Sequence, residues 1–260
     1  GEHDFLLFIL RGDGVLLASP LDHRGDYAGE PRRAALGATR LCAAPGWDGE
    51  SYVAAWLAAD DHGGARLVLA SLRPSGAVAR SRTTAVPAGG SCALAVGDRS
   101  IALIYTAARG TALTIAGAHG STDVDLPALA GRDGRVLRVV ATVGGFALLL
   151  RSASGDLRVV ELDRRGRAVR DHEVGSPVVA DTADLGANRG GIFVAWTDAR
   201  RAWIAGLNGE GELTRRWATR GGSQPSTARA LGRASECASA WTSLGGRYVH
   251  AALATDCPRR

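Results

Sequence analysis

The most constraining feature of this sequence is a unit that recurs at nearly constant spacing along its 260 residues. Apolar segments typical of strands end at positions spaced by 46, 49, 45, 46 and 45 residues: Leu10, Trp56, Tyr105, Leu150, Trp196 and Trp241. A second set of apolar positions follows with steps of 51, 46, 44, 45 and 46 residues: Leu21, Leu72, Ala118, Leu162, Leu207 and Leu253. Two independent markers thus share one period, and roughly 40–50 residues is the length of one β-propeller blade.

The pattern inside each unit predicts a sheet of four short strands. In the clearest copy these strands are expected at 183–187, 192–196, 202–207 and 212–219. The second strand is entirely apolar, as a strand covered on both faces must be, and the fourth is polar, as an exposed edge strand can be. Turns closed by glycine are expected after the third strands, at 22–25, 73–76 and 163–166. No segment has the periodicity of an amphipathic helix, so the fold class is predicted to be all-β.

The period predicts a single domain over residues 1–260, a six-bladed β-propeller with one incomplete blade. The expected repeats are approximately 1–37, 38–87, 88–131, 132–178, 179–222 and 223–260. The sequence opens on a second strand and ends just after a third strand, so one inner strand and one outer strand have no obvious sequence. Either upstream residues have been lost, or residues 1–4 and 254–260 complete the ring irregularly.

Charge and hydropathy argue against nucleic-acid binding and against a membrane span. The net charge is +5, and all 31 basic residues are arginine. They are spread along the whole chain rather than gathered on one face, which argues against nucleic-acid binding. No apolar run approaches the roughly 20 residues that a membrane-spanning helix needs, so no membrane span is expected.

Methionine and cysteine usage point to export. The chain has no methionine, so we expect a processed or trimmed product whose signal peptide has been removed. Its four cysteines fit two disulfides in a secreted, periplasmic or cell-surface protein, although four buried thiols in a cytosolic protein are the alternative. The simplest pairs are Cys237 with Cys257, around one hairpin, and Cys42 with Cys92, on consecutive first strands. The spacing of the cysteines does not match a metal site, and no cofactor is expected.

Two segments carry a family resemblance. The run IFVAWTDAR at 192–200, followed by IAGLNGEGEL at 204–213, resembles the VxW-x-D-x-R repeats of secreted bacterial β-propellers. Residues 52–56 with 66–72 form a second copy, and weaker copies cover the rest of the chain. The resemblance implies a propeller architecture and export, and it carries no catalytic motif.

Candidate ligand-binding residues come from the loops between second and third strands, because propeller ligands usually bind at one mouth of the central channel. Asp60, Asp61 and His62 could serve acid–base chemistry or hold a cation, but a solvated hairpin turn is the favoured interpretation. Arg109, in the loop at 107–110, and Trp47, expected in a turn, are further candidates. Asp198 and Arg200 form a D-x-R pair, for which hydrogen bonds within their own hairpin turn are the favoured interpretation.

Three functions fit these features. The first is a non-catalytic binding or scaffold propeller that recognises a glycan or a protein. The second is a glycoside hydrolase or lyase, which would need groups such as Asp61, His62 and Asp198 to converge at one mouth. The third is a structural subunit whose incomplete blade is filled by a second chain. No catalytic residue and no metal ligand is assigned, since repeats without a catalytic signature favour the first function.

Overall fold

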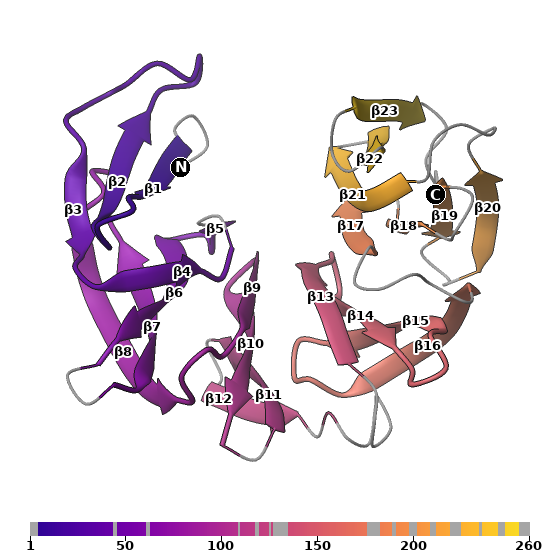
Figure 1. Ribbon diagram of the computed structural model, residues 1–260, viewed down its shortest axis with the longest axis horizontal. Helices are drawn as coiled ribbons and strands as arrows, with labels where there is room; N and C mark the ends of the chain where they lie inside the picture. The colour runs from indigo at the N-terminus through magenta and orange to yellow at the C-terminus, as the bar shows by residue number, and fades with distance from the viewer. Residues whose placement is uncertain are drawn as a thin grey trace. The chain divides into compact units, whose positions relative to one another are not determined.

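The computed structural model shows an all-β protein (Figure 1). It describes residues 5–43, 46–60, 63–108, 110–117, 120–124, 126, 135–175, 183–188, 191–197, 202–208, 212–218, 225–233, 236–243 and 248–254, with the backbone alone at 120, 188, 202 and from 213 onward. The chain forms two compact units, residues 1–124 and 125–260. Within the described part, no helix is long and apolar enough to cross a membrane.

The described strands of the first unit form three antiparallel sheets. The strand orders are β1-β2-β3, then β4-β6-β7-β8 with β5 attached to β6, and then β9-β10-β11-β12. The strands are β1 (Phe5–Leu10), β2 (Leu16–Leu21), β3 (Arg32–Ala35), β4 (Ala38–Leu41), β5 (Gly46–Trp47), β6 (Tyr52–Ala59), β7 (Ala65–Leu72), β8 (Val78–Val86), β9 (Cys92–Gly97), β10 (Ser100–Ala107), β11 (Gly110–Gly117) and β12 (Gly120–Val124).

The described strands of the second unit also form three antiparallel sheets, with the orders β13-β14-β15-β16, β17-β18-β19-β20 and β21-β22-β23. The strands are β13 (Arg135–Ala141), β14 (Gly145–Arg151), β15 (Leu157–Asp163), β16 (Ala168–Gly175), β17 (Asp184–Asn188), β18 (Gly191–Thr197), β19 (Ala202–Asn208), β20 (Leu213–Ala218), β21 (Pro225–Arg233), β22 (Glu236–Ser243) and β23 (Tyr248–Ala254). The four strands expected in the clearest copy of the repeat are confirmed as β17 to β20.

The second strand of a sheet is buried on both faces, as its apolar sequence requires. In β6 every residue except the last is buried. Tyr52, Ala54 and Trp56 pack in one core with β1 and β2, whereas Val53 and Leu57 pack on the opposite face in a core with β10. A corresponding core in the second unit joins β14 and β15 to β17, β18 and β19. The sheets of a unit therefore stack face to face, and each interior strand contributes to two cores.

Neighbouring sheets are also linked through their first strands. Cys42, directly after β4, forms a disulfide with Cys92 at the start of β9, with the two Cα atoms 4.9 Å apart. This is one of the two predicted pairs; for the other, the side chain of Cys237 and all of Cys257 lie outside the described residues. In the second unit, Arg138 of β13 donates from Nε to Oδ1 of Asp184 in β17 at 2.7 Å. The linked residues are 50 and 46 positions apart, close to one repeat.

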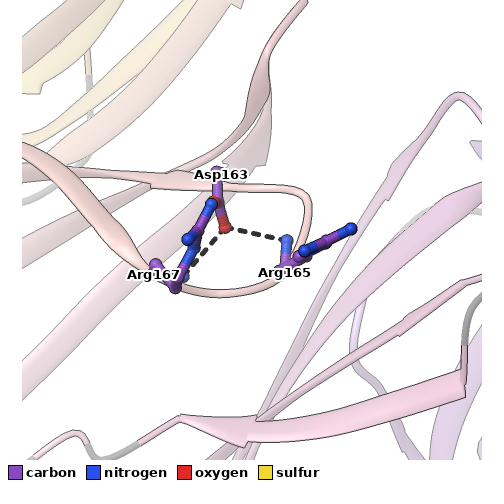
Figure 2. Close-up of polar contacts among 3 residues, drawn as sticks. All are labelled: Asp163, Arg165 and Arg167. Atoms are coloured by element: carbon purple, nitrogen blue, oxygen red, sulfur yellow. Dashed lines mark hydrogen bonds and ion pairs between the residues drawn. The ribbon is translucent and has the colours of Figure 1, made fainter.

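Aspartate side chains stabilise two of the hairpins that follow third strands, at Asp22 and at Asp163. Figure 2 shows that Oδ1 of Asp163 accepts from the backbone N–H groups of Arg165 at 2.8 Å and Arg167 at 3.0 Å. Burial alone would raise the pKa of Asp163. The hydrogen bonds from the backbone and side chain of Arg167 and from the backbone of Arg165 outweigh burial, so that the pKa lies below its ordinary value.

The glycine-closed turns are confirmed in all three places. The N–H groups of Gly25, Gly76 and Gly166 donate to the carbonyl oxygens three residues earlier at 3.0, 2.9 and 2.9 Å. Their φ angles are 86°, 80° and 82°, in the left-handed region that glycine enters without a steric penalty. The sequence therefore specifies these turns locally.

The first and last sheets each contain three described strands. In the first sheet β1 pairs with β2 alone, so no described strand occupies the inner position beside it. In the last sheet β23 pairs with β22 alone, and no described strand lies on its outer side. These are the two positions for which the sequence offers no obvious strand.

Candidate binding groove

The structure gives a structural role to Asp60, at the end of the β6–β7 hairpin. Its Oδ1 accepts from the backbone N–H of Gly64 at 2.7 Å, and its own N–H donates to the Gly64 carbonyl at 3.2 Å. The carboxylate thus stabilises its own turn, as Asp163 does. The remaining loop candidates, Asp61, His62, Arg109, Asp198 and Arg200, lie outside the described residues.

The expected position of Trp47 in a turn is wrong. Trp47 lies in the short strand β5, where it pairs with Tyr52 of β6, and the two rings meet edge-on with centroids 5.1 Å apart. The ring packs against the core shared by β1, β2 and β6 and is partly buried. The turn is shorter than expected because Asp48 closes it, accepting at Oδ1 from the N–H groups of Glu50 at 2.9 Å and Ser51 at 2.8 Å.

An acidic cluster of Asp171, His172 and Glu173 lies on β16, the outer strand of its sheet, where charged side chains oppose pairing with another molecule. Arg158 of β15 is paired with Asp171, and His172 Nε2 lies 3.4 Å from Oε1 of Glu161. Among the residues that the structure describes, no group of three or more His, Cys, Asp or Glu side chains could hold a metal ion.

A groove of 530 Å³ opens between the second and third sheets of the first unit. Aliphatic side chains from three strands line it: Val53 of β6, Leu69 of β7 and Ile101 of β10. Two turns close one end, the Asp48 turn before β6 and the turn of Asp98 and Arg99 before β10. The groove lies at the opposite end of β6 from Asp60, away from the loops that the sequence favoured.

Three arginines surround this groove. Arg80 and Arg82 extend from the outer strand β8, and Arg99 extends from the turn before β10. All three are exposed, and none forms an ion pair or a side-chain hydrogen bond with another residue that the structure describes. Of the two carboxylates in the lining, Asp48 is engaged in its own turn. The groove therefore presents unpaired guanidinium groups above an aliphatic floor.

Arg99 also holds a backbone conformation that is unusual for its residue type. Its φ of 54° is the only positive value for a non-glycine residue in the described part of the chain. Its N–H donates to the carbonyl of Asp48 at 2.8 Å, which joins the turns of neighbouring sheets. Such a conformation costs about 1 kcal/mol or more and persists only where its surroundings impose it. This contact fixes the backbone of Arg99, from which the side chain extends to line the groove.

Reasoning from the sequence missed the groove because its residues share no linear motif. Arg80 and Arg82 belong to one repeat and Arg99 to the next, so they meet only when the two sheets pack. The single local signal was the Arg-x-Arg spacing on an outer strand, which places both side chains on one face.

The sequence matches no protein-family model, and no curated protein matches it. Solved structures do resemble the fold. The AfRom2 CNH domain superposes with a TM-score of 0.54 at 12% identity over 95% of this chain and 76% of that one. A neuraminidase-like protein of A/little yellow-shouldered bat/Guatemala superposes with a TM-score of 0.52 at 7% identity, over 91% of this chain and 85% of that one. The dihydro-heme d1 dehydrogenase NirN superposes with a TM-score of 0.56 at 14% identity. The match covers 98% of this chain and 52% of NirN.

These likenesses define the class of protein. The neighbours are β-propeller proteins, and the stacked antiparallel sheets of this chain have the same construction. The chain is therefore an all-β protein with a β-propeller fold. At 7–14% identity the likeness extends to the fold alone, and the neighbours' activities differ from one another.

Proposed function

We propose that this chain is an exported, non-catalytic binding propeller of six blades, one of them incomplete, which recognises a glycan or a protein partner through the arginine-rimmed groove. The single observation that carries the proposal is the set of three guanidinium groups, Arg80, Arg82 and Arg99, which have no partner among the described residues and lie around an aliphatic floor. Arginine presents several rigid N–H donors and suits bidentate binding of carboxylate, sulfate or phosphate groups.

The local chemistry of the groove supports recognition. Elsewhere, Arg158 and Arg167 are paired with neighbouring aspartates, Asp171 and Asp163. The groove arginines, in contrast, keep their donors available for a ligand. Binding there would replace water around an exposed guanidinium without first breaking an internal ion pair.

The disulfide supports export. Disulfides form and persist in oxidising compartments, and Cys42–Cys92 joins two sheets as a structural cross-link. Release of the protein outside the cytosol, in the periplasm or at the cell surface is therefore part of the proposal.

The proposal is tested by screening the purified chain against a glycan array and a peptide array. The same screens are run with Arg80→Ala/Arg82→Ala and with the matched control Arg24→Ala/Arg73→Ala, which removes two exposed arginines from turns of the same unit. Signals should fall in the groove variant and persist in the control. Absence of signal on both arrays, or equal signals from the two variants, would contradict the proposal.

A further inference from the structure

The strand β8 forms the outer edge of the second sheet. Along Val78–Val86 it pairs with β7 on one side, and no described strand pairs with its other side. Eight of its nine residues are exposed. Such an edge offers a row of backbone N–H and C=O groups to which an extended chain can add as a further strand.

The register of β8 against β7 determines which side chains of β8 lie on the face of the sheet that lines the groove. Arg82 is opposite Leu69, and Arg80 is opposite Ser71, and directly opposite residues share one face of a sheet. Leu69 belongs to the face that packs toward Ile101 of the next sheet. Both guanidinium groups are therefore on the groove face of β8.

The spacing of these charges fits an extended peptide. Residues two apart on a strand lie roughly 6.6–6.8 Å apart, so alternate side chains of an added strand recur at the same interval as Arg80 and Arg82. Oppositely charged residues on adjacent strands stabilise pairing, and like charges oppose it. An acidic residue at every second position would face the two arginines in turn.

The lining of the groove favours a peptide over a sugar ring or a nucleobase. Among its described lining residues none is aromatic, so the groove offers no stacking platform of the kind that sugars and bases use. Its floor is instead aliphatic, at Val53, Leu69 and Ile101, which suits a short apolar side chain from a strand.

We propose that β8 and the groove bind an extended acidic peptide segment, with carboxylates at alternate residues, as an additional antiparallel or parallel strand. This inference rests on the proposed binding function and names its ligand class. The arginines oppose pairing of basic strands with the edge, including β8 of a second copy of this chain, because like charges would then lie opposite one another. Arg99 contacts the peptide from the neighbouring sheet.

The probe is a fluorescently labelled nine-residue peptide in which Glu and Val alternate, titrated with the full chain while anisotropy is recorded. We expect Arg80→Glu/Arg82→Glu to weaken binding by about tenfold or more, because two attractions become repulsions. Arg24→Glu/Arg73→Glu, with the same change in net charge, should shift the dissociation constant by less than about twofold. Equal weakening in the two variants would overturn the proposal, because binding would then follow net charge alone.

Two further probes use the unaltered protein, so that folding of a variant does not enter. The same peptide with alternate backbone nitrogens methylated keeps its charge but loses strand hydrogen bonds, and it should bind at least about tenfold more weakly. A sulfated tetrasaccharide should bind more weakly than the acidic peptide. Equal binding of the methylated peptide overturns strand addition. Binding of the tetrasaccharide without binding of the peptide overturns this inference while leaving the proposed binding function intact.

Discussion

Removal of the Cys42–Cys92 disulfide should destabilise the first unit by about 4 kcal/mol. The cross-link joins residues 50 positions apart, and closure of a loop of that length removes chain entropy from the unfolded state worth about 4 kcal/mol at 25 °C. A single domain is stable by about 5–15 kcal/mol, so the expected loss is a large share of the total. The variant Cys42→Ser/Cys92→Ser isolates this effect, because reduction would also act on the other two cysteines.

The assay is urea unfolding followed by tryptophan fluorescence. With a urea dependence of about 2 kcal/mol per molar, the midpoint should fall by about 2 M. Since the cross-link requires both sulfurs, Cys42→Ser, Cys92→Ser and the double variant should lose nearly the same stability. A loss below about 1 kcal/mol in the double variant, or losses in the single variants that add up in the double one, would refute the loop-entropy reasoning.

Three further outcomes follow from the described contacts. Asp184→Asn should cost about 2 kcal/mol by removing a charged hydrogen bond from Arg138, and a double-mutant cycle with Arg138→Gln should show non-additive losses. Arg99→Gly should stabilise the fold by about 0.5–1 kcal/mol by relieving its left-handed conformation, measured by thermal unfolding, while weakening ligand binding. The pKa of Asp163 is lower in the folded state than its unfolded value near 3.8. The carboxylate therefore stabilises the fold above that unfolded value, and this contribution is lost as the pH falls through the folded pKa. Asp163→Asn should flatten the acid dependence of stability in denaturant titrations between pH 5 and 2, and an unchanged profile would contradict the argument.

The strands and turns could be predicted because local sequence specifies them. Apolar runs such as 52–58 fit only a strand covered on both faces, and the glycine that closes the turns at 22–25, 73–76 and 163–166 provides a left-handed residue. The short strand β5 could not be predicted in this way. Gly46 and Trp47 resemble turn residues, and they pair with β6 because the Asp48 turn is tight and the Trp47 ring gains contact with Tyr52.

The groove shows the limit of reading one repeat at a time. Arg82 and Arg99 come from different positions in consecutive repeats, so no comparison of equivalent residues would bring them together. Their proximity depends on how far the outer strand β8 extends beside the next sheet. That distance is set by packing of the aliphatic floor between the sheets, which is a non-local property.

The cross-links between first strands were accessible to such a comparison. The backbone N–H of Cys42 donates to the carbonyl of Ala55, Arg138 is opposite Leu149, and Asp184 is opposite Ala195. Each of these partners on the second strand lies one residue before the apolar marker of its repeat. Equivalent positions of adjacent sheets in the second unit thus hold an arginine facing an aspartate. In the first unit Cys92 is opposite the marker Tyr105 itself, so the two bonded cysteines are one position away from strict equivalence. A first strand has a neighbour within its sheet on one side only, so a link to the next sheet compensates for the missing ladder. Opposite charges one period apart in a repeat sequence therefore indicate a contact between adjacent sheets. The separation of 46 residues between Arg138 and Asp184 equals one repeat, so this contact could be predicted from the sequence.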